Sequence, residues 1–263
     1  MLLSVTLIIL LCFATITNNV LICPTLRSAA NFAVVAASSV SSNGLTVING
    51  NLAISPSVSL TGFNSTGVIY GITELGTATA LQAQQDVLSA YNDLKGMPLT
   101  AQMTGVDLAG KTLEPGIYKF DSAAGIDTFE GILTLNGSGI YIFQVGSALT
   151  TSANSEIRLI NGAKIGCIFW QVGSSATLGP YSRFVGNILA YASVGLATGV
   201  IYNGSIYAQT AAISFIADTV TKQTSCDVCQ IIPDPIQSRF NRNLPQNTSL
   251  SIVIMLLVSF FQR

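Results

Sequence analysis

The sequence predicts a mainly β fold in which short parallel strands stack as the coils of a solenoid. Residues 142–147 (IFQVGS) recur as residues 168–174 (IFWQVGS), and looser copies begin at Ile188 and Ile206. The later copies lie about twenty residues apart, a period typical of stacked β-coils. Charge is almost absent from this section, because the charged side chains between residues 131 and 217 are Glu156, Arg158, Lys164 and Arg183. Its outer surface should therefore carry small neutral groups, which suit ordered water or a flat solid better than a charged ligand.

The residues before the repeated section predict short strands and a loop. Residues 33–54 alternate small and β-branched residues around the turn dipeptides Asn43-Gly44 and Asn49-Gly50. This pattern indicates two or three short strands. Residues 55–71 contain turn signals and are predicted to form a loop.

Residues 77–94 predict one long helix of about five turns. Its apolar side chains recur at steps of three and four, and Gly96 and Pro98 end the pattern. Strand patterning resumes in residues 108–120 and 128–135. The strands before the helix must therefore either cap the solenoid or complete it from its far end. The helical stripe consists of Ala80, Ala83, Val87, Ala90, Tyr91 and Leu94.

Composition excludes several classes of function. The chain has 263 residues, of which 9% are charged, a net charge of −1 and no histidine. Its length fits one domain of roughly 200 residues with terminal extensions. Nucleic acid is not an expected partner, because binding it requires clustered Lys and Arg. Without histidine the chain lacks the usual general base and metal ligand, so no metal site is expected.

Both ends of the chain carry apolar runs. Residues 1–14 contain no charged side chain and have the length of a secretory signal, which is too short to span a bilayer comfortably. Residues 249–263 form a second apolar tail behind a polar stretch, and this tail is either a disordered end or a lipid-anchor signal. We therefore expect a secreted monomer, with attachment to the membrane or cell surface through the tail as the alternative. The expected segments are a signal peptide in residues 1–25, cut between about 17 and 25, a solenoid domain in residues 26–221, a polar linker containing cysteine in residues 222–248, and the tail.

Cysteines and sequons suit an exported chain. If cleavage precedes Cys23, four cysteines remain, and their pairing cannot be read from the sequence. Cys226 and Cys229 form a CxxC and are the disulfide candidates, as a small terminal disulfide or a capping staple, because zinc would need a second such pair or histidine. The candidate glycosylation sites are Asn64, Asn136 and Asn203, and a fourth sequon begins at Asn247. Asn136-Gly137 and Asn203-Gly204 are also turn dipeptides, which can equally mark strand reversals.

Seven motifs in fixed order resemble one known family. The resemblance runs from about Ala29 to Val220, nearly the whole predicted domain. The family is the microbial ice-binding protein family, whose members share a discontinuous β-solenoid. The motifs are residues 29–34 (AANFAV), 50–56 (GNLAISP), 82–86 (QAQQD) with 90–93 (AYND), 113–118 (LEPGIY), 160–163 (INGA), 169–179 (FWQVGSSATLG) and 184–190 (FVGNILA).

The resemblance implies a right-handed parallel β-helix with one long helix packed alongside. It also implies adsorption to ice through one flat face of the solenoid, which limits crystal growth and recrystallisation. No catalytic residue and no cofactor is implied. The expected partner is therefore ice or an ordered water surface.

An alignment of four repeat copies predicts which residues form that face. Period-two alternation directs one set of residues inward and the next set outward. The inward set is mostly apolar, and Gly195 and Ser214 interrupt the threonines of the central outward column. Small outward residues also serve solubility and close stacking, so the pattern alone is compatible with a structural surface. The candidate face consists of Ala148, Ser175, Ser193 and Ala212, then Thr150, Thr177, Gly195 and Ser214, then Ser152, Gly179 and Ala197, with Ile216 protruding at the end of the third column.

Two other functions compete with ice binding. The same scaffold could be an adhesive or structural module that binds a cell wall or another surface, which the apolar tail favours. A polysaccharide-cleaving enzyme would need clustered carboxylates. Asp121, Asp127 and Glu130 do cluster in the sequence, but in a segment rich in turn residues that favours a solvated loop. We therefore do not expect an enzyme.

Overall fold

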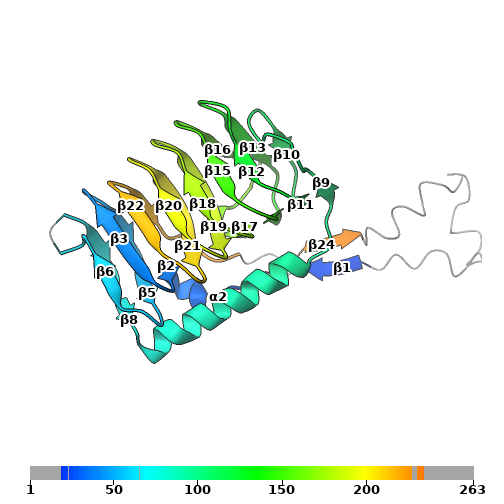
Figure 1. Cartoon of the computed structure of the whole chain (residues 1–263). Helices are drawn as coiled ribbons and strands as arrows, with labels where there is room; N and C mark the ends of the chain where they lie inside the picture. Colours follow the sequence, from blue (N-terminus) through cyan, green and yellow to red (C-terminus); the bar gives the residue numbers. More distant parts are fainter. Residues whose placement is uncertain (1–18, 23, 65, 227–229, 234–263) are drawn as a thin grey trace, which may run out of the picture. The chain divides into compact units, whose positions relative to one another are not determined.

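The computed structural model describes residues 19–22, 24–64, 66–226 and 230–233 (Figure 1). The solenoid belongs to a compact unit, Ile22–Gln230. Two short strands, β1 (Asn19–Ile22) and β24 (Gln230–Pro233), pair in a separate two-stranded sheet. Among the described residues, no helix is long and apolar enough to cross a membrane.

Each coil of the solenoid contributes one strand to each of three parallel ladders. One such coil consists of β14 (Tyr141–Val145), β15 (Leu149–Thr151) and β16 (Glu156–Ile160). The next coil begins with β17 (Ile168–Val172), whose residues pair in register with those of β14, so that Phe143 lies beside Trp170. The sequence repeat therefore corresponds to successive coils, as predicted.

The first ladder is the helix-covered face, against which α2 packs. Its strands are β9 (Ala101–Gln102), β11 (Gly116–Phe120), β14, β17, the second half of β19 (Arg183–Ala190), the second half of β21 (Ile201–Ala208), β2 (Phe32–Ala36), β5 (Asn51–Ile54) and β8 (Thr73–Leu75).

We name the second ladder the small-residue face and the third ladder the third face. The small-residue face contains β12 (Ala124–Ile126), β15, β18 (Ala176–Leu178), β20 (Val194–Leu196), β22 (Ile213–Ile216), β3 (Ser39–Asn43) and β6 (Ser59–Thr61). The third face contains β10 (Thr112–Leu113), β13 (Ile132–Asn136), β16, the first halves of β19 and β21, β23 (Thr219–Thr221), β4 (Val47–Asn49) and β7 (Val68–Tyr70).

The coils do not stack in sequence order. β3 pairs with β22, β4 with β23 and β2 with β21, so the N-terminal coils lie on the last C-terminal coil. In Figure 1 the blue strand β3 lies beside the orange strand β22. Of the two arrangements that the sequence left open, the early strands complete the solenoid from its far end.

The predicted helix is α2 (Ala78–Gly96), which extends two residues beyond the expected end. Thr77 caps it, because its Oγ1 accepts a hydrogen bond from the Ala80 amide at 3.2 Å. All six residues of the predicted stripe are buried. At the other end, Gln144 Nε2 donates to the carbonyls of Leu94 and Met97, both at 2.8 Å, so a side chain from β14 satisfies the free end of the helix.

Aromatic side chains form a continuous stack through the core. Ring centroids are 5.6 Å apart between Tyr118 and Phe143 and 3.9 Å apart between Phe143 and Trp170. Phe184 and Tyr202 continue the stack at 5.1 and 5.7 Å. The indole N–H of Trp170 donates to the Val185 carbonyl at 3.1 Å, so its polar group is satisfied inside the core.

One local prediction was wrong, and one alternative that the sequence left open is excluded. The region predicted as a loop, residues 55–71, contains strands β6 and β7, which form because the preceding coil offers each of them a paired partner. Asn203-Gly204 is not a strand reversal but lies inside β21. Gly204 has a φ of +142° there, and the strand passes from the third face to the helix-covered face at this point.

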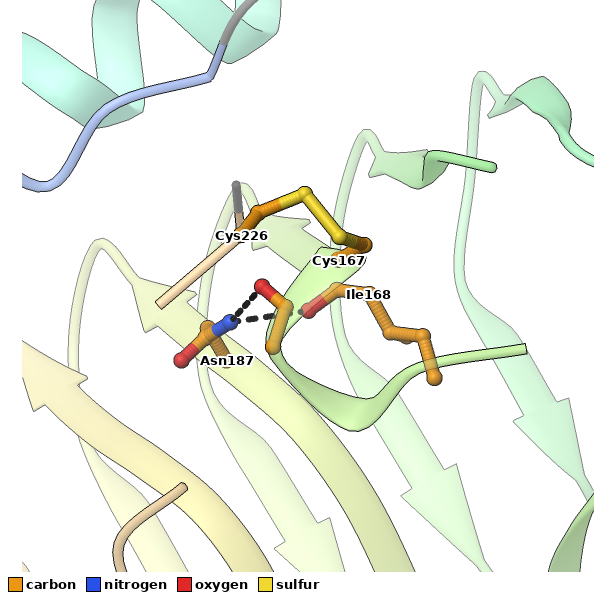
Figure 2. Close-up of a disulfide and its surroundings, with 5 residues drawn as sticks. Cys167, Ile168, Asn187 and Cys226 are labelled. Carbon is orange, nitrogen blue, oxygen red and sulfur yellow. Dashed lines mark hydrogen bonds between the residues drawn. A yellow bond between two sulfur atoms is a disulfide. The ribbon is translucent and has the colours of Figure 1, made fainter. Parts of the chain in front are cut away.

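The disulfide prediction needs a correction of its partner. Cys226 is bonded to Cys167 and not to Cys229, which lies outside the described residues. The bond is possible because residues 222–226 lie along the solenoid, with the Lys222 amide donating to the Asn49 carbonyl at 3.0 Å. Figure 2 shows Asn187 beside the disulfide, where its Nδ2 donates to the carbonyls of Gly166 and Ile168, both at 3.1 Å.

Candidate functional site

The structure assembles the predicted outward residues on the small-residue face. Strand register aligns Thr150 with Thr177, Thr177 with Gly195, and Gly195 with Ser214. Thr150, Thr177 and Ser214 are exposed, and Gly195 is half-buried. Their predicted inward neighbours are all buried, so the alternation is confirmed: Leu149, Thr151, Ala176, Leu178, Val194, Leu196, Ile213 and Phe215.

The first column forms a backbone ladder at the entry to the same strands. The amides of Leu149, Ala176 and Val194 donate to the carbonyls of Ser175, Ser193 and Ala212 at 3.0–3.1 Å. The hydroxyls of Ser175 and Ser193 lie 2.9 Å apart and share a hydrogen bond. These two hydroxyls are therefore oriented by one another.

The third column contributes less surface than predicted. Gly179 is buried, its amide donates to Thr151 Oγ1 at 2.9 Å, and a Cβ there would lie 2.5 Å from the Thr151 carbonyl oxygen. Ser152 and Ala197 are half-buried, whereas Ile216 protrudes with 40% of its surface exposed. The second column is therefore the most exposed part of the face, whereas the first column is half-buried throughout.

The sequence alignment missed four residues that extend these columns. Strand β3 adds Ser39 and Ser41, and β6 adds Ser59 and Thr61. Ser41 pairs with both Ser214 and Thr61, so the central column continues onto the N-terminal coils. The signal was present, because Ser39-Val40-Ser41 and Ser59-Leu60-Thr61 alternate small and apolar residues as residues 175–177 do.

Charge is confined to one end of this face. Asp127 follows strand β12, at the end of the face opposite the N-terminal strands β3 and β6. Its Oδ1 accepts a hydrogen bond from Thr150 Oγ1 at 2.9 Å. The third face instead has charges in its middle, where Glu156 pairs in register with Arg183 and lies 3.2 Å from Arg158. The helix covers the remaining face. In the described structure, the small-residue face is thus not covered by the helix and has no charged residue in its middle.

Two of the three acidic residues considered for catalysis, Asp121 and Asp127, have structural partners. Asp121 forms an ion pair with Lys119 at 3.2 Å, and Asp127 accepts a hydrogen bond from the Thr150 hydroxyl. Within the described residues, no group of three or more His, Cys, Asp or Glu could hold a metal ion.

The three described sequons differ in accessibility. Asn64 is exposed in the turn between β6 and β7. Asn136 is half-buried and hydrogen-bonded through its side-chain amide to Glu114 and Asn161. Asn203 is half-buried within β21.

Comparison with known proteins places the chain in a family. A family model described as ice-binding-like matches residues 34–221. The chain belongs to the ice-binding-like family. It is 40% identical over 220 residues to an ice-binding protein of Nostoc sp., covering 81% of this chain and 80% of the relative. It is 33% identical over 208 residues to an ice-binding protein of Flavobacterium frigoris, covering 73% and 74% of the two chains.

A solved structure of the ice-binding-like family confirms the predicted fold. The crystal structure of the ice-binding protein from the Antarctic ascomycete Antarctomyces psychrotrophicus aligns with a TM-score of 0.72 at 39% identity. The alignment covers 76% of this chain and 98% of that chain. The family resemblance and the β-solenoid with one long helix are thus both confirmed.

Proposed function

We propose that this protein is an exported ice-binding protein that adsorbs to ice through the small-residue face and slows ice growth and recrystallisation. The observation that carries the proposal is the face itself. Within the described structure, its first two columns present Ala, Gly, Ser and Thr, and its charged residue, Asp127, lies at one end. Similarity to proteins named for ice binding supports the same conclusion.

The geometry of the face suits ordered water. Neighbouring parallel strands lie about 4.8 Å apart, so Thr150 and Thr177 present hydroxyls and methyls at that spacing, and Ser214 adds a hydroxyl beyond the gap at Gly195. Their inward neighbours are locked in the core, which keeps the rows rigid. Such an array can hold waters through hydrogen bonds at little additional entropic cost. A charged side chain would instead organise water around itself.

We infer export from the apolar run at residues 1–14. The Cys167–Cys226 disulfide supports this, since disulfides persist in oxidising compartments. Cleavage after Thr17 would retain strand β1, whereas cleavage near Cys23 would remove it. N-terminal sequencing of the native protein measures the cut, and an intact Met1 on protein from inside the cell would contradict export.

If the route is eukaryotic secretion, we expect a glycan on Asn64 in preference to the other two described sequons. Asn64 lies exposed in a turn, whereas Asn136 uses its amide nitrogen in a bond to Glu114. Mass spectrometry of glycopeptides would locate the modification. Occupancy at Asn136 or Asn203 with Asn64 bare would overturn this order.

The decisive test of the face compares the same substitution on two faces. Thr177→Tyr places a bulky ring in the centre of the small-residue face, and Thr219→Tyr places it on the exposed side of the third face. Both changes should leave stability within about 0.5 kcal/mol of the parent, because both side chains point outward. Ice-affinity partitioning and recrystallisation inhibition should fall for Thr177→Tyr and remain for Thr219→Tyr.

A charged substitution provides a second test of the same face. Ser193→Lys would also break the hydroxyl contact with Ser175, so the exposed Ser214→Lys is the cleaner variant. If both Thr177→Tyr and Ser214→Lys fold and inhibit recrystallisation like the parent, another face carries the activity. If the parent itself does not adsorb to ice, the alternative of a surface-adhesion module replaces the proposal.

A further inference from the structure

A cavity of about 570 Å³ lies between helix α2 and the strands beneath its last turns. The helix supplies Leu88, Tyr91, Asn92 and Lys95, and the opposite wall comes from β11, β14, β17 and the corner at Tyr191. The volume lies in the range of small-ligand sites. None of these residues belongs to the small-residue face, so the cavity has no part in the proposed ice adsorption.

Two glycines line one part of the cavity floor. Gly146 and Gly173 occupy equivalent corners of successive coils. A Cβ on Gly173 would lie 2.4 Å from the Gly146 carbonyl oxygen, and one on Gly146 would lie 2.6 Å from that of Asp121. The close stacking of the corners therefore requires glycine at both positions, where the backbone itself borders the cavity.

One wall offers an aromatic surface to a ligand. Tyr191 is 51% exposed, and its ring lies 6.3 Å from the ring of Tyr91, which is buried. Leu88, 49% exposed, lines the same side. Flat apolar surfaces of this kind can pack against the C–H face of a sugar ring, while the phenolic hydroxyl remains available for hydrogen bonding.

The charged groups of the lining have a net positive balance. Lys95 Nζ lies 6.0 Å from the centre of the Tyr91 ring, and Lys119 Nζ lies 3.2 Å from Asp121 Oδ1. Asp121 also accepts a hydrogen bond from Gln102 at 2.6 Å. Two lysines against one carboxylate leave a positive balance, which favours a ligand that carries carboxylate groups.

Amide groups complete the polar part of the cavity. The side-chain nitrogen of Gln144 is used by the end of the helix, but the exposed Asn92 can donate and accept hydrogen bonds. Gln171, the partner of Gln144 in the ladder, lines the floor. Gln171 is buried and hydrogen-bonded to Tyr91, so Asn92 is the amide that can bond a hydroxyl of a polyol.

We propose that this cavity binds a saccharide that carries a uronate group. The carboxylate of the sugar lies between Lys95 and Lys119, and its ring packs on Tyr191. A neutral sugar leaves the positive balance unpaired, and an acidic peptide does not supply hydroxyls to the amides. Such a site would hold the protein in an acidic polysaccharide while the small-residue face stays free.

Calorimetric titration of the full exported chain with trigalacturonate tests the proposal, with maltotriose as the neutral probe. We expect saturable binding of trigalacturonate that weakens at least about tenfold in Lys95→Gln and in Tyr191→Ala, a change of about 1.4 kcal/mol. Lys111→Gln and Tyr70→Ala make the same changes at exposed positions outside the cavity and should leave affinity unchanged.

Three results would overturn the proposal. They are the absence of saturable binding up to about 10 mM, equal affinity for maltotriose, and insensitivity to both cavity variants. Recrystallisation inhibition is measured on the same four variants and should match the parent. Failure of saccharide binding is therefore distinguishable from failure of ice adsorption.

Discussion

Gly195 interrupts the central column of the small-residue face, and Gly195→Thr should raise both ice adsorption and stability. The position is the centre of strand β20, between Thr177 and Ser214. A Cβ built there would meet one neighbour within 4 Å, the Ser214 hydroxyl at 3.5 Å, which is ordinary van der Waals contact. Its φ lies outside the left-handed region that favours glycine. The threonine would extend the row from Thr150 through Thr177 to Ser214 without a gap.

The size of the stability gain follows from the strand environment. Glycine in a regular element costs about 0.5–1 kcal/mol through its conformational entropy, and strand propensities span about 1 kcal/mol with threonine among the favoured residues. We therefore expect a gain of about 1 kcal/mol. For a domain of about 200 residues this corresponds to a rise in melting temperature of about 2–4 °C.

Gly179→Thr is the matched control, because the same change at the next column meets the backbone. A Cβ at Gly179 would lie 2.5 Å from the Thr151 carbonyl oxygen and 2.6 Å from the Ser152 carbonyl carbon. This variant should lose about 1–3 kcal/mol through overpacking. Thermal unfolding and ice-affinity partitioning are measured for both. A Gly195→Thr variant that is more stable but adsorbs less ice than the parent would refute the role of the column.

The remaining predictions concern the scaffold. Replacing Cys167 and Cys226 together by alanine opens a cross-link over 59 residues, and the chain-entropy model gives a loss of about 4 kcal/mol; a loss below about 0.5 kcal/mol in denaturant unfolding would contradict it. Val87→Asp should cost about 3–5 kcal/mol, because Val87 is fully buried and the new charge has no partner. Burial raises the pKa of Asp218 to about 6, although its oxygens accept hydrogen bonds from the Ile216 and Val200 amides, which lower the pKa. Its folded pKa is above the usual value of about 3.9, so its contribution to stability is fully present below pH 4 and declines by up to about 3 kcal/mol as pH rises through 6. The free energy of unfolding, measured against pH, should no longer show this decline in Asp218→Asn. A pH profile equal to that of the parent would contradict the assignment.

Much of the fold could be predicted because the pattern that encodes it is local. Alternation over three to five residues placed Leu149 and Ala176 inside and Thr150 and Thr177 outside. Steps of three and four residues identified the buried stripe of α2. Both signals arise from the geometry of a single element, which is fixed by the sequence of that element.

The features that were missed depend on how distant segments meet. Strands β3 and β22 pair across about 170 residues of sequence, and no local pattern specifies that pairing. The partner of Cys226 depends on the path of residues 222–226 along the solenoid. Gly179 occupies an outward register position, but the adjacent backbone at Thr151 and the corner that follows bury it.

The stacking order also determines the length of the candidate face. Without the N-terminal coils, the central column would end at Ser214, whose strand edge would be open to solvent or to another chain. Ser41 and Thr61 close that edge and add two rows of hydroxyls to the column. The chain therefore covers the end of its C-terminal coils with segments that carry the same small outward residues. The segments that protect the edge thus enlarge the surface proposed to contact ice, while Asp127 and the charges of β16 and β19 lie outside the rows that they add.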